Sequence, residues 1–171
     1  MKIYTILQQA VIILLLSNFS YSQDWVQQSV PLTSGYFLDM KFANANTGYI
    51  CNSTPLFLKT TDSGFNWQTV NNFNITSLAV IDSMYVYGAG HTAGYSKLYK
   101  STDSGITWDS LLQNSPYFAS LYFFNRDTGL ISGYDGFNVF IGRTTNGGQT
   151  AVQVYTINSS HFTKFFFVKK K

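Results

Sequence analysis

An eight-residue segment occurs twice and, in weaker form, a third time, and this repetition constrains the fold more than any other feature. The strong copies read T-T-D-S-G-F-N-W at residues 60–67 and S-T-D-S-G-I-T-W at residues 101–108, and the third reads T-T-N-G-G-Q-T-A at residues 144–151. Equivalent positions lie 41 and then 43 residues apart, and a basic residue precedes each copy. A period of about 40 residues is typical of β-propellers, in which each repeat forms one four-stranded blade. The repeat therefore predicts propeller blades.

The composition favours β-sheet as well. The 171 residues include 12 Tyr, 15 Phe and 3 Trp but no Glu, and only 11% are charged. Aromatic residues are enriched in strands, whereas long helices use Glu and Ala heavily. Disordered chains are rich in charge and poor in aromatics, which this chain is not. We therefore expect an all-β fold.

Patterns within each repeat predict four short antiparallel strands. Residues 37–42 alternate apolar and polar side chains, as in a strand with one buried face. A second landmark, F-A-N-A-N-T-G-Y at residues 42–49, recurs as F-F-N-R-D-T-G-L at residues 123–130. In the second repeat we expect Met84–Tyr87 to form the second strand. The propeller region should cover residues 23–157, with three complete blades at about 31–70, 71–112 and 113–157.

One further segment suggests that the propeller is incomplete. Residues Trp25–Val30 precede the first repeat, and we expect them to form an orphan fourth strand. Closed propellers have about four to eight blades, so three blades would leave apolar faces and strand edges open. Two outcomes are expected: self-association of two arcs into a homodimeric ring, or a poorly soluble N-terminal fragment of a longer propeller. The blade count favours the fragment.

The repeated turn resembles the Asp-box, or bacterial neuraminidase repeat, with the pattern S/T-x-D-x-G-x-T-W. The F-x-N-x-x-T-G landmark adds to this resemblance. With both elements, residues 25–157 are similar to the photosystem II stability and assembly factor-like propellers, which include secreted bacterial members. The resemblance implies that each box joins the third and fourth strands of a blade on its outer rim. The box residues are Asp62, Gly64, Trp67, Asp103, Gly105, Trp108, Asn146 and Gly148.

The chemistry of the box indicates a structural role. An Asp carboxylate at a turn accepts hydrogen bonds from backbone N–H groups just ahead of it, and Gly adopts positive φ at little cost. The Trp side chain then buries a large ring against the turn or the neighbouring blade. The third copy departs from the pattern at Asn146 and Ala151, so we expect its turn to be looser. A calcium loop would need further oxygen ligands that the box lacks.

The residues needed for glycoside hydrolysis are missing. The resemblance implies that a sialidase would use three Arg and a Tyr–Glu nucleophile pair, but the chain has two Arg and no Glu. Paired Asp could serve other glycosidases, yet the spacing of Asp39, Asp82, Asp127 and Asp135 pairs none of them, and the sequence around Asp135 predicts a turn. One Cys and two His are too few for a closed zinc site. We expect no catalysis, cofactor or metal.

The leading hypothesis is an exported, non-catalytic propeller module that contacts a protein or a glycan. The alternative is part of a glycoside hydrolase-type, sialidase-like propeller whose catalytic residues lie elsewhere. Most aromatic residues must fill a sheet core, but a few could bind sugars. The candidate glycan-contact residues are Tyr36, Tyr95, Tyr117 and Tyr134.

The N-terminus predicts export. Residues 1–22 combine Lys2, a short apolar core and small polar residues, as in a signal peptide cleaved between Ser22 and Gln23. We expect a secreted or periplasmic protein without a membrane span after cleavage, and with a tail at residues 158–171. Lys2 and the three terminal residues Lys169–Lys171 are four of the eleven basic residues, and without them residues 23–168 contain seven basic residues against eight Asp. This balance argues against nucleic-acid binding. The single Cys51 should be buried.

Overall fold

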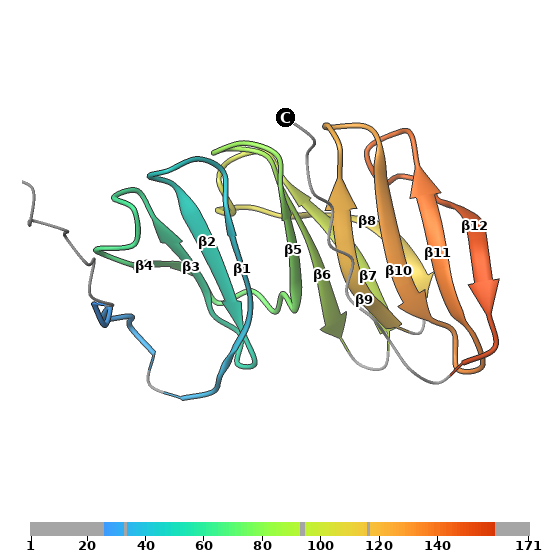
Figure 1. The fold of residues 1–171 in the computed structure, drawn as a ribbon, viewed down its shortest axis with the longest axis horizontal. Coiled ribbons are helices and arrows are strands. Elements are labelled where there is room, and N and C mark those ends of the chain that lie inside the picture. The colour runs from blue at the N-terminus through green and yellow to red at the C-terminus, as the bar shows by residue number, and fades with distance from the viewer. Residues whose placement is uncertain (1–25, 33, 93–94, 116, 160–171) are drawn as a thin grey trace, which may run out of the picture.

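The computed structural model describes residues 26–32, 34–92, 95–115 and 117–159. The expected signal peptide at residues 1–22 and all but the first two residues of the expected tail at 158–171 therefore lie outside the described residues. Within these ranges the chain forms three four-stranded sheets (Figure 1). The strands are β1 (Phe37–Phe42), β2 (Gly48–Asn52), β3 (Phe57–Thr60), β4 (Gln68–Asn71), β5 (Ser77–Val80), β6 (Val86–Thr92), β7 (Tyr95–Ser101), β8 (Asp109–Ser115), β9 (Tyr117–Phe123), β10 (Gly129–Tyr134), β11 (Val139–Thr144) and β12 (Val152–Ile157).

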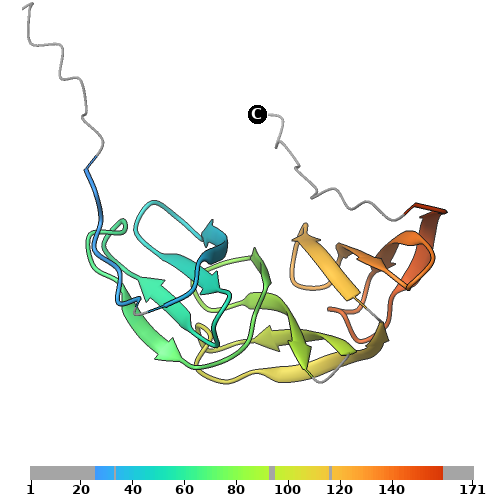
Figure 2. The same ribbon diagram turned by 90° about the horizontal axis from the view of Figure 1, so that it is seen from below.

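Each sheet is one propeller blade. Its four strands follow one another in chain order and pair antiparallel, as β1-β2-β3-β4, β5-β6-β7-β8 and β9-β10-β11-β12. The blades are arranged in an arc, with β1, β5 and β9 on its concave side (Figure 2). β5 contacts both β1 and β9, so the first strands of successive blades are neighbours. The predicted all-β, incomplete propeller with three complete blades is confirmed.

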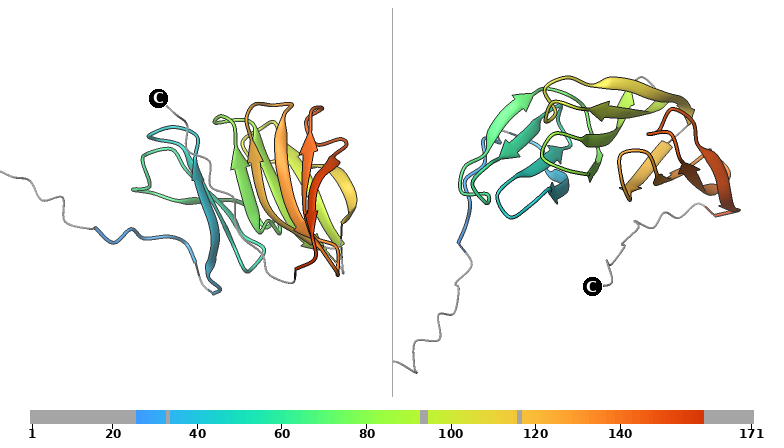
Figure 3. Two further views of the ribbon diagram at one scale, coloured as in Figure 1. Left: turned by 45° about the vertical axis from the view of Figure 1, so that its right-hand side comes forward. Right: turned by 90° about the horizontal axis from the view of Figure 1, so that it is seen from above.

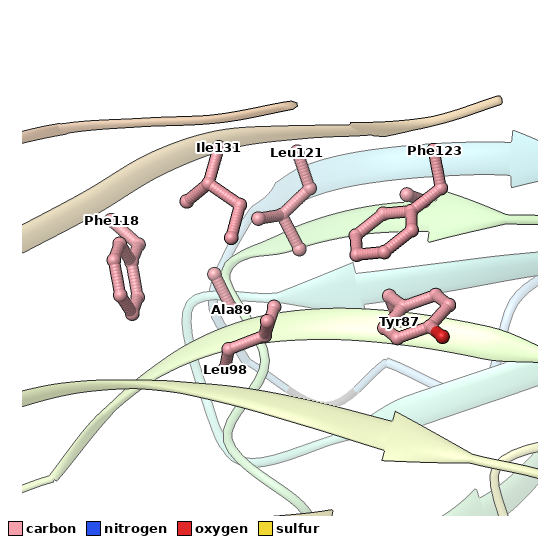
Figure 4. Close-up of a cluster of buried hydrophobic side chains, with 8 residues drawn as sticks. Tyr87, Ala89, Leu98, Phe118, Leu121, Phe123 and Ile131 are labelled. Carbon is pink, nitrogen blue, oxygen red and sulfur yellow. The ribbon is translucent and has the colours of Figure 1, made fainter. Parts of the chain in front are cut away.

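The hydrophobic core lies between the blades. Because side chains alternate across a strand, each inner sheet face can pack against the next blade. One cluster joins the first two blades: Tyr49, Cys51, Phe57, Ile75, Leu78, Val86 and Tyr99. A second joins the last two, and Figure 4 shows most of it: Ala79, Tyr87, Ala89, Leu98, Phe118, Leu121, Phe123 and Ile131. Cys51 is buried as expected.

Two of the expected strands differ from the structure. β6 begins at Val86 rather than Met84, because the N–H groups of Met84 and Tyr85 each donate to Asp82 Oδ1 (both 2.8 Å) and hold these residues in a turn. Residues 26–32 have no regular secondary structure, so the described part of the expected orphan strand at Trp25–Val30 is not a strand. A strand needs a partner, and among the described residues no strand pairs with this segment.

In the part of the chain that the structure describes, no helix has both the length and the hydropathy required to cross a membrane.

Candidate functional site

The first repeated turn is held by hydrogen bonds from the side chains of Asp62 and Thr60. Asp62 Oδ1 accepts from the N–H of Asn66 and the hydroxyl of Thr60, both at 2.8 Å, and Asp62 Oδ2 accepts from Asn66 Nδ2 at 2.7 Å. Thr60 Oγ1 in turn accepts from the N–H of Gly64 at 3.0 Å. The bonds from Asn66 and Thr60 lower the pKa of the Asp62 carboxyl group. Both oxygens of this carboxylate are therefore used inside the turn.

The second turn repeats this arrangement. Asp103 Oδ1 accepts from the N–H of Thr107 at 2.9 Å and from the Ser101 hydroxyl at 2.8 Å. Ser101 Oγ accepts from the N–H of Gly105 at 2.7 Å. Hydrogen bonds from Thr107 and Ser101 lower the pKa of Asp103. Both turns join the third and fourth strands of their blades, as the resemblance implied.

The third turn has the same hydrogen bonds, so the expectation of a looser turn was wrong. Asn146 Oδ1 accepts from the N–H of Thr150 at 3.0 Å and from the Thr144 hydroxyl at 3.1 Å, while the N–H of Gly148 donates to Thr144 Oγ1 at 2.9 Å. An amide oxygen replaces the carboxylate oxygen because the turn needs an acceptor rather than a charge. The substitution by Ala151 removes only the aromatic ring.

The box glycines have the expected backbone conformation. Gly64, Gly105 and Gly148 have φ of 90°, 85° and 83°, values that side chains disfavour. The residue just before each glycine is left-handed too, and these residues are Ser63, Ser104 and Gly147. Sequence reasoning missed this second left-handed position, which the glycine in the third copy could have indicated.

The box glycines also allow close packing between blades. A Cβ atom on Gly105 would collide with Phe57 of the first blade, and one on Gly148 would collide with Leu98 of the second. A Cβ atom on Gly64 would approach only its own turn's Trp67. Each box glycine that has a preceding blade therefore receives an apolar side chain from that blade's third strand.

Aromatic contacts place the Trp108 ring at the boundary between the first two blades. Its ring packs edge-on against Phe57 at 5.3 Å between centroids and stacks on Phe73 at 5.6 Å. Trp67 instead meets Phe42 of its own blade, edge-on at 6.1 Å. The box Trp was expected to pack against the turn or the neighbouring blade: Trp67 lies beside Gly64 of its own turn, and Trp108 packs against the neighbouring blade.

Two tyrosine hydroxyls connect the blades, a feature that sequence reasoning missed. Tyr49 donates to the backbone carbonyl of Ser83 at 2.5 Å, and Tyr87 donates to the carbonyl of Arg126 at 2.6 Å. Both tyrosines lie on the second strand of their blade. Each is the register partner of the basic residue that precedes the box, Lys59 for Tyr49 and Lys100 for Tyr87. Aligning the repeats would have revealed them. Leu130 has this position in the third blade.

The candidate glycan-contact tyrosines lie at the opposite end of the sheets from the box turns. Tyr36 precedes β1, Tyr95 and Tyr117 begin β7 and β9, and Tyr134 ends β10, all at the lower end in Figure 1. Tyr36, Tyr95 and Tyr117 are exposed and Tyr134 is half-buried. Alternating strand direction therefore brings four residues, far apart in sequence, to one end of the arc.

Contacts join two of these tyrosines and a histidine into one surface. Tyr117 and Tyr134 are register partners on β9 and β10. The ring of His91, at the end of β6, lies 4.3 Å from the Tyr117 ring and so extends the group into the second blade. Burial lowers the pKa of His91, which favours its neutral form. We call the group made up of the exposed Tyr95, Tyr117 and Phe137 and the half-buried His91 and Tyr134 the aromatic strip. Tyr36 belongs to the first blade and is not part of it.

The carboxylates of Asp39 and Asp135 also serve the fold. Asp39 Oδ2 accepts from the N–H of Leu78 in the next blade at 2.9 Å. Asp135 Oδ1 accepts from Asn138 N–H at 2.7 Å and from Phe137 N–H at 2.9 Å, which forms the predicted turn and lowers the pKa of Asp135.

Asp82 has a lowered pKa too. Burial alone would raise the pKa of Asp82, but the N–H groups of the turn and the Arg126 guanidinium at 2.9 Å outweigh it. A general acid at neutral pH needs a raised pKa, and the carboxylates of Asp62, Asp82, Asp103 and Asp135 are shifted the other way. Among the described residues, no three His, Cys, Asp or Glu side chains gather as they would around a metal ion.

No protein-family model matches this chain, and the search of curated proteins found no match. Its structure is similar to that of YCF48 from Cyanidioschyzon merolae, with 19% identity and a TM-score of 0.64 over 78% of this chain and 44% of that one. A structure of YCF48 bound to a D1 peptide gives 17% identity and a TM-score of 0.60, over 75% and 42% of the two chains. The GH74 enzyme of Niastella koreensis gives 22% and 0.53, over 70% and 22%.

These likenesses concern the fold. The chain spans less than half the length of each of these solved structures. The expected resemblance to the photosystem II assembly factor is confirmed at the level of architecture: the chain forms three blades of a β-propeller of the kind found in YCF48.

Proposed function

We propose that this protein is a non-catalytic propeller module that binds a protein segment through the aromatic strip. The observation that carries the proposal is the contact of His91 with Tyr117, beside Tyr134, which joins the lower ends of two blades into one apolar and hydrogen-bonding surface. Tyr side chains are enriched at binding interfaces because they offer a large rigid ring and a polar tip. A propeller of similar fold, YCF48, was solved with a bound D1 peptide, which supports a protein partner.

Glycan binding is the second candidate. Exposed Tyr rings offer flat apolar faces for sugar stacking, and an enzyme of the GH74 type shares the fold. Catalysis on glycans is not part of this proposal, because the Asp carboxylates described above hold turns and blade contacts. Hydrolysis of any substrate in a panel of chromogenic glycosides would revive the glycoside hydrolase alternative.

The test compares two substitutions in the aromatic strip with a matched change at the other end of the blades. Tyr117→Ala and Tyr134→Ala should abolish capture of partners from the producing organism, or binding on a glycan array. Phe65→Ala removes a more exposed aromatic ring from a box turn and should leave binding unchanged. Equal binding by all three variants would contradict the proposal.

We further propose that the module is exported and acts outside the cytoplasm, either secreted or periplasmic. The signal-like composition of residues 1–22 supports this. The intact mass of the exported protein should correspond to a chain beginning at Gln23. A mass that includes residues 1–22 would contradict cleavage at this site.

A further inference from the structure

The face of the first blade that points away from the second blade carries apolar side chains like those at the blade interfaces, but these side chains are exposed. We call it the receiving face. Met40 and Phe42 lie on this face, and they are 55% and 42% exposed. Their counterparts at the same positions of the third repeat, Leu121 and Phe123, are 4% and 7% exposed. The exposed fractions at equivalent positions of the repeat thus differ about tenfold. The reason is that the second blade covers this face of the third blade, whereas no described blade covers it on the first.

The covered interface shows what such a face receives. Phe123 stacks on Tyr87 of the second blade, with 3.7 Å between centroids and 5° between planes (Figure 4). Gly148 packs against Leu98, three residues before the box of the second blade. The interface between the first two blades repeats the second contact, with Gly105 against Phe57.

The first blade has an apolar groove at the corresponding place. The groove has a volume of about 540 Å³, and Met40, Phe42, Gly64 and Trp67 are among the residues that line it, together with Gln28 and Val30 from the segment before the first blade. Gly64 stands at the position where Gly105 and Gly148 receive an apolar side chain from the preceding blade. In both interfaces inside the described chain, the side chain at this position comes from the third strand of the preceding blade.

The third blade presents the complementary face at the other end of the arc (Figure 3). Ile131 points back toward the second blade, so Ile141, paired with the neighbouring Ser132, points outward. Ile141 lies three residues before the third box, the position of Phe57 and Leu98 in the other blades. Tyr155, its register partner on β12, is an exposed aromatic residue on the same face.

We propose that the third blade of a second copy of this chain docks on the first blade, head to tail, with Ile141 against Gly64 and Phe42. Both interfaces between the three described blades join the face that carries Phe57 or Leu98, the counterparts of Ile141, to the receiving face of the next blade. The Ile141 face and the receiving face of the first blade would therefore continue an established interface. The dimer is closed when both contacts form at once, so that the first blade of each copy receives the third blade of the other.

The test uses charge substitutions on the two faces of the full chain. The chain should have the mass of a dimer by light scattering. Met40→Asp and Ile141→Asp should each raise the dimer dissociation constant by about tenfold or more, because a buried unpaired charge is costly. Mixing the two variants should restore a dimer, since one interface then combines two unaltered faces.

Phe65→Asp is the control. Its counterpart Ile106 stays exposed although a blade precedes it, so this position lies outside the interface and the dimer should persist. Circular dichroism confirms that each variant is folded. A monomeric or aggregated unaltered chain would overturn the proposal. So would a dimer that survives Ile141→Asp, or a mixture of the two variants that stays monomeric.

Discussion

The hydroxyl of Tyr87 on β6 donates a hydrogen bond to the backbone carbonyl of Arg126, 2.6 Å away, in the turn between β9 and β10. The same tyrosine ring stacks on Phe123, so one side chain contributes both an apolar and a polar contact between two blades. Tyr49 makes the equivalent hydrogen bond one blade earlier. Blades are therefore joined by a repeated polar contact at the rim as well as by apolar packing.

Removing this hydroxyl should weaken the joint between the second and third blades. We expect Tyr87→Phe to lower the free energy of unfolding by about 1 kcal/mol, because the carbonyl of Arg126 loses its donor while the ring stays in place. Urea denaturation measures the difference. Tyr36→Phe, which alters an exposed tyrosine that precedes the first blade, is the matched control and should have no effect.

The same residue predicts sensitivity to alkaline pH. Burial, and secondarily the charge of Asp127, raise the pKa of Tyr87 to about 12 from 10.0. The folded state thus favours the neutral phenol. Its contribution is fully present below pH 10 and is lost as the pH rises through about 12. Melting temperatures between these values should fall less steeply for Tyr87→Phe than for the unaltered chain, and equal slopes would contradict the assignment.

Alanine substitutions at two box glycines should distinguish the free-energy cost of positive φ from the cost of overpacking between blades. Gly64→Ala places a side chain at positive φ, which costs about 1–2 kcal/mol. Gly105→Ala adds a collision with Phe57 to the same conformational cost, and overpacking typically costs about 1–3 kcal/mol more. Chemical denaturation of the two variants provides the comparison. Equal losses would show that the packing against Phe57 relaxes freely.

The box carboxylates predict sensitivity to acid. The pKa values of Asp62 and Asp103 are lowered, so their contribution to stability is present above the unfolded pKa of about 3.8 and is lost as the pH falls through the lower folded value. Asp103→Asn should keep the turn at neutral pH, as Asn146 does in the third box, and should melt at a higher temperature than the unaltered chain at pH 3. A variant already destabilised at pH 7 would show that the turn requires the charge.

The sequence by itself determined the local structure. The spacing of the boxes and the alternation in segments such as residues 37–42 depend only on neighbouring residues, and from them the blades, the box turns and the buried Cys51 were predicted. Errors arose where a local pattern had two interpretations. Met84 and Tyr85 suit a strand, but the Asp82 side chain holds them in a turn, and Asn146 seemed a poor replacement for Asp although the turn uses only an acceptor.

Only the tertiary structure decided which residues meet. His91 and Tyr117 belong to different blades, and their contact depends on the angle between two sheets, which no local pattern encodes. The collision that excludes a side chain at Gly105 likewise comes from Phe57, a residue of another blade. The expectation of an orphan strand at Trp25–Val30 was wrong for its described residues 26–30 for a related reason. These residues are strand-like, but a strand forms only where another chain segment offers its N–H and C=O groups for pairing.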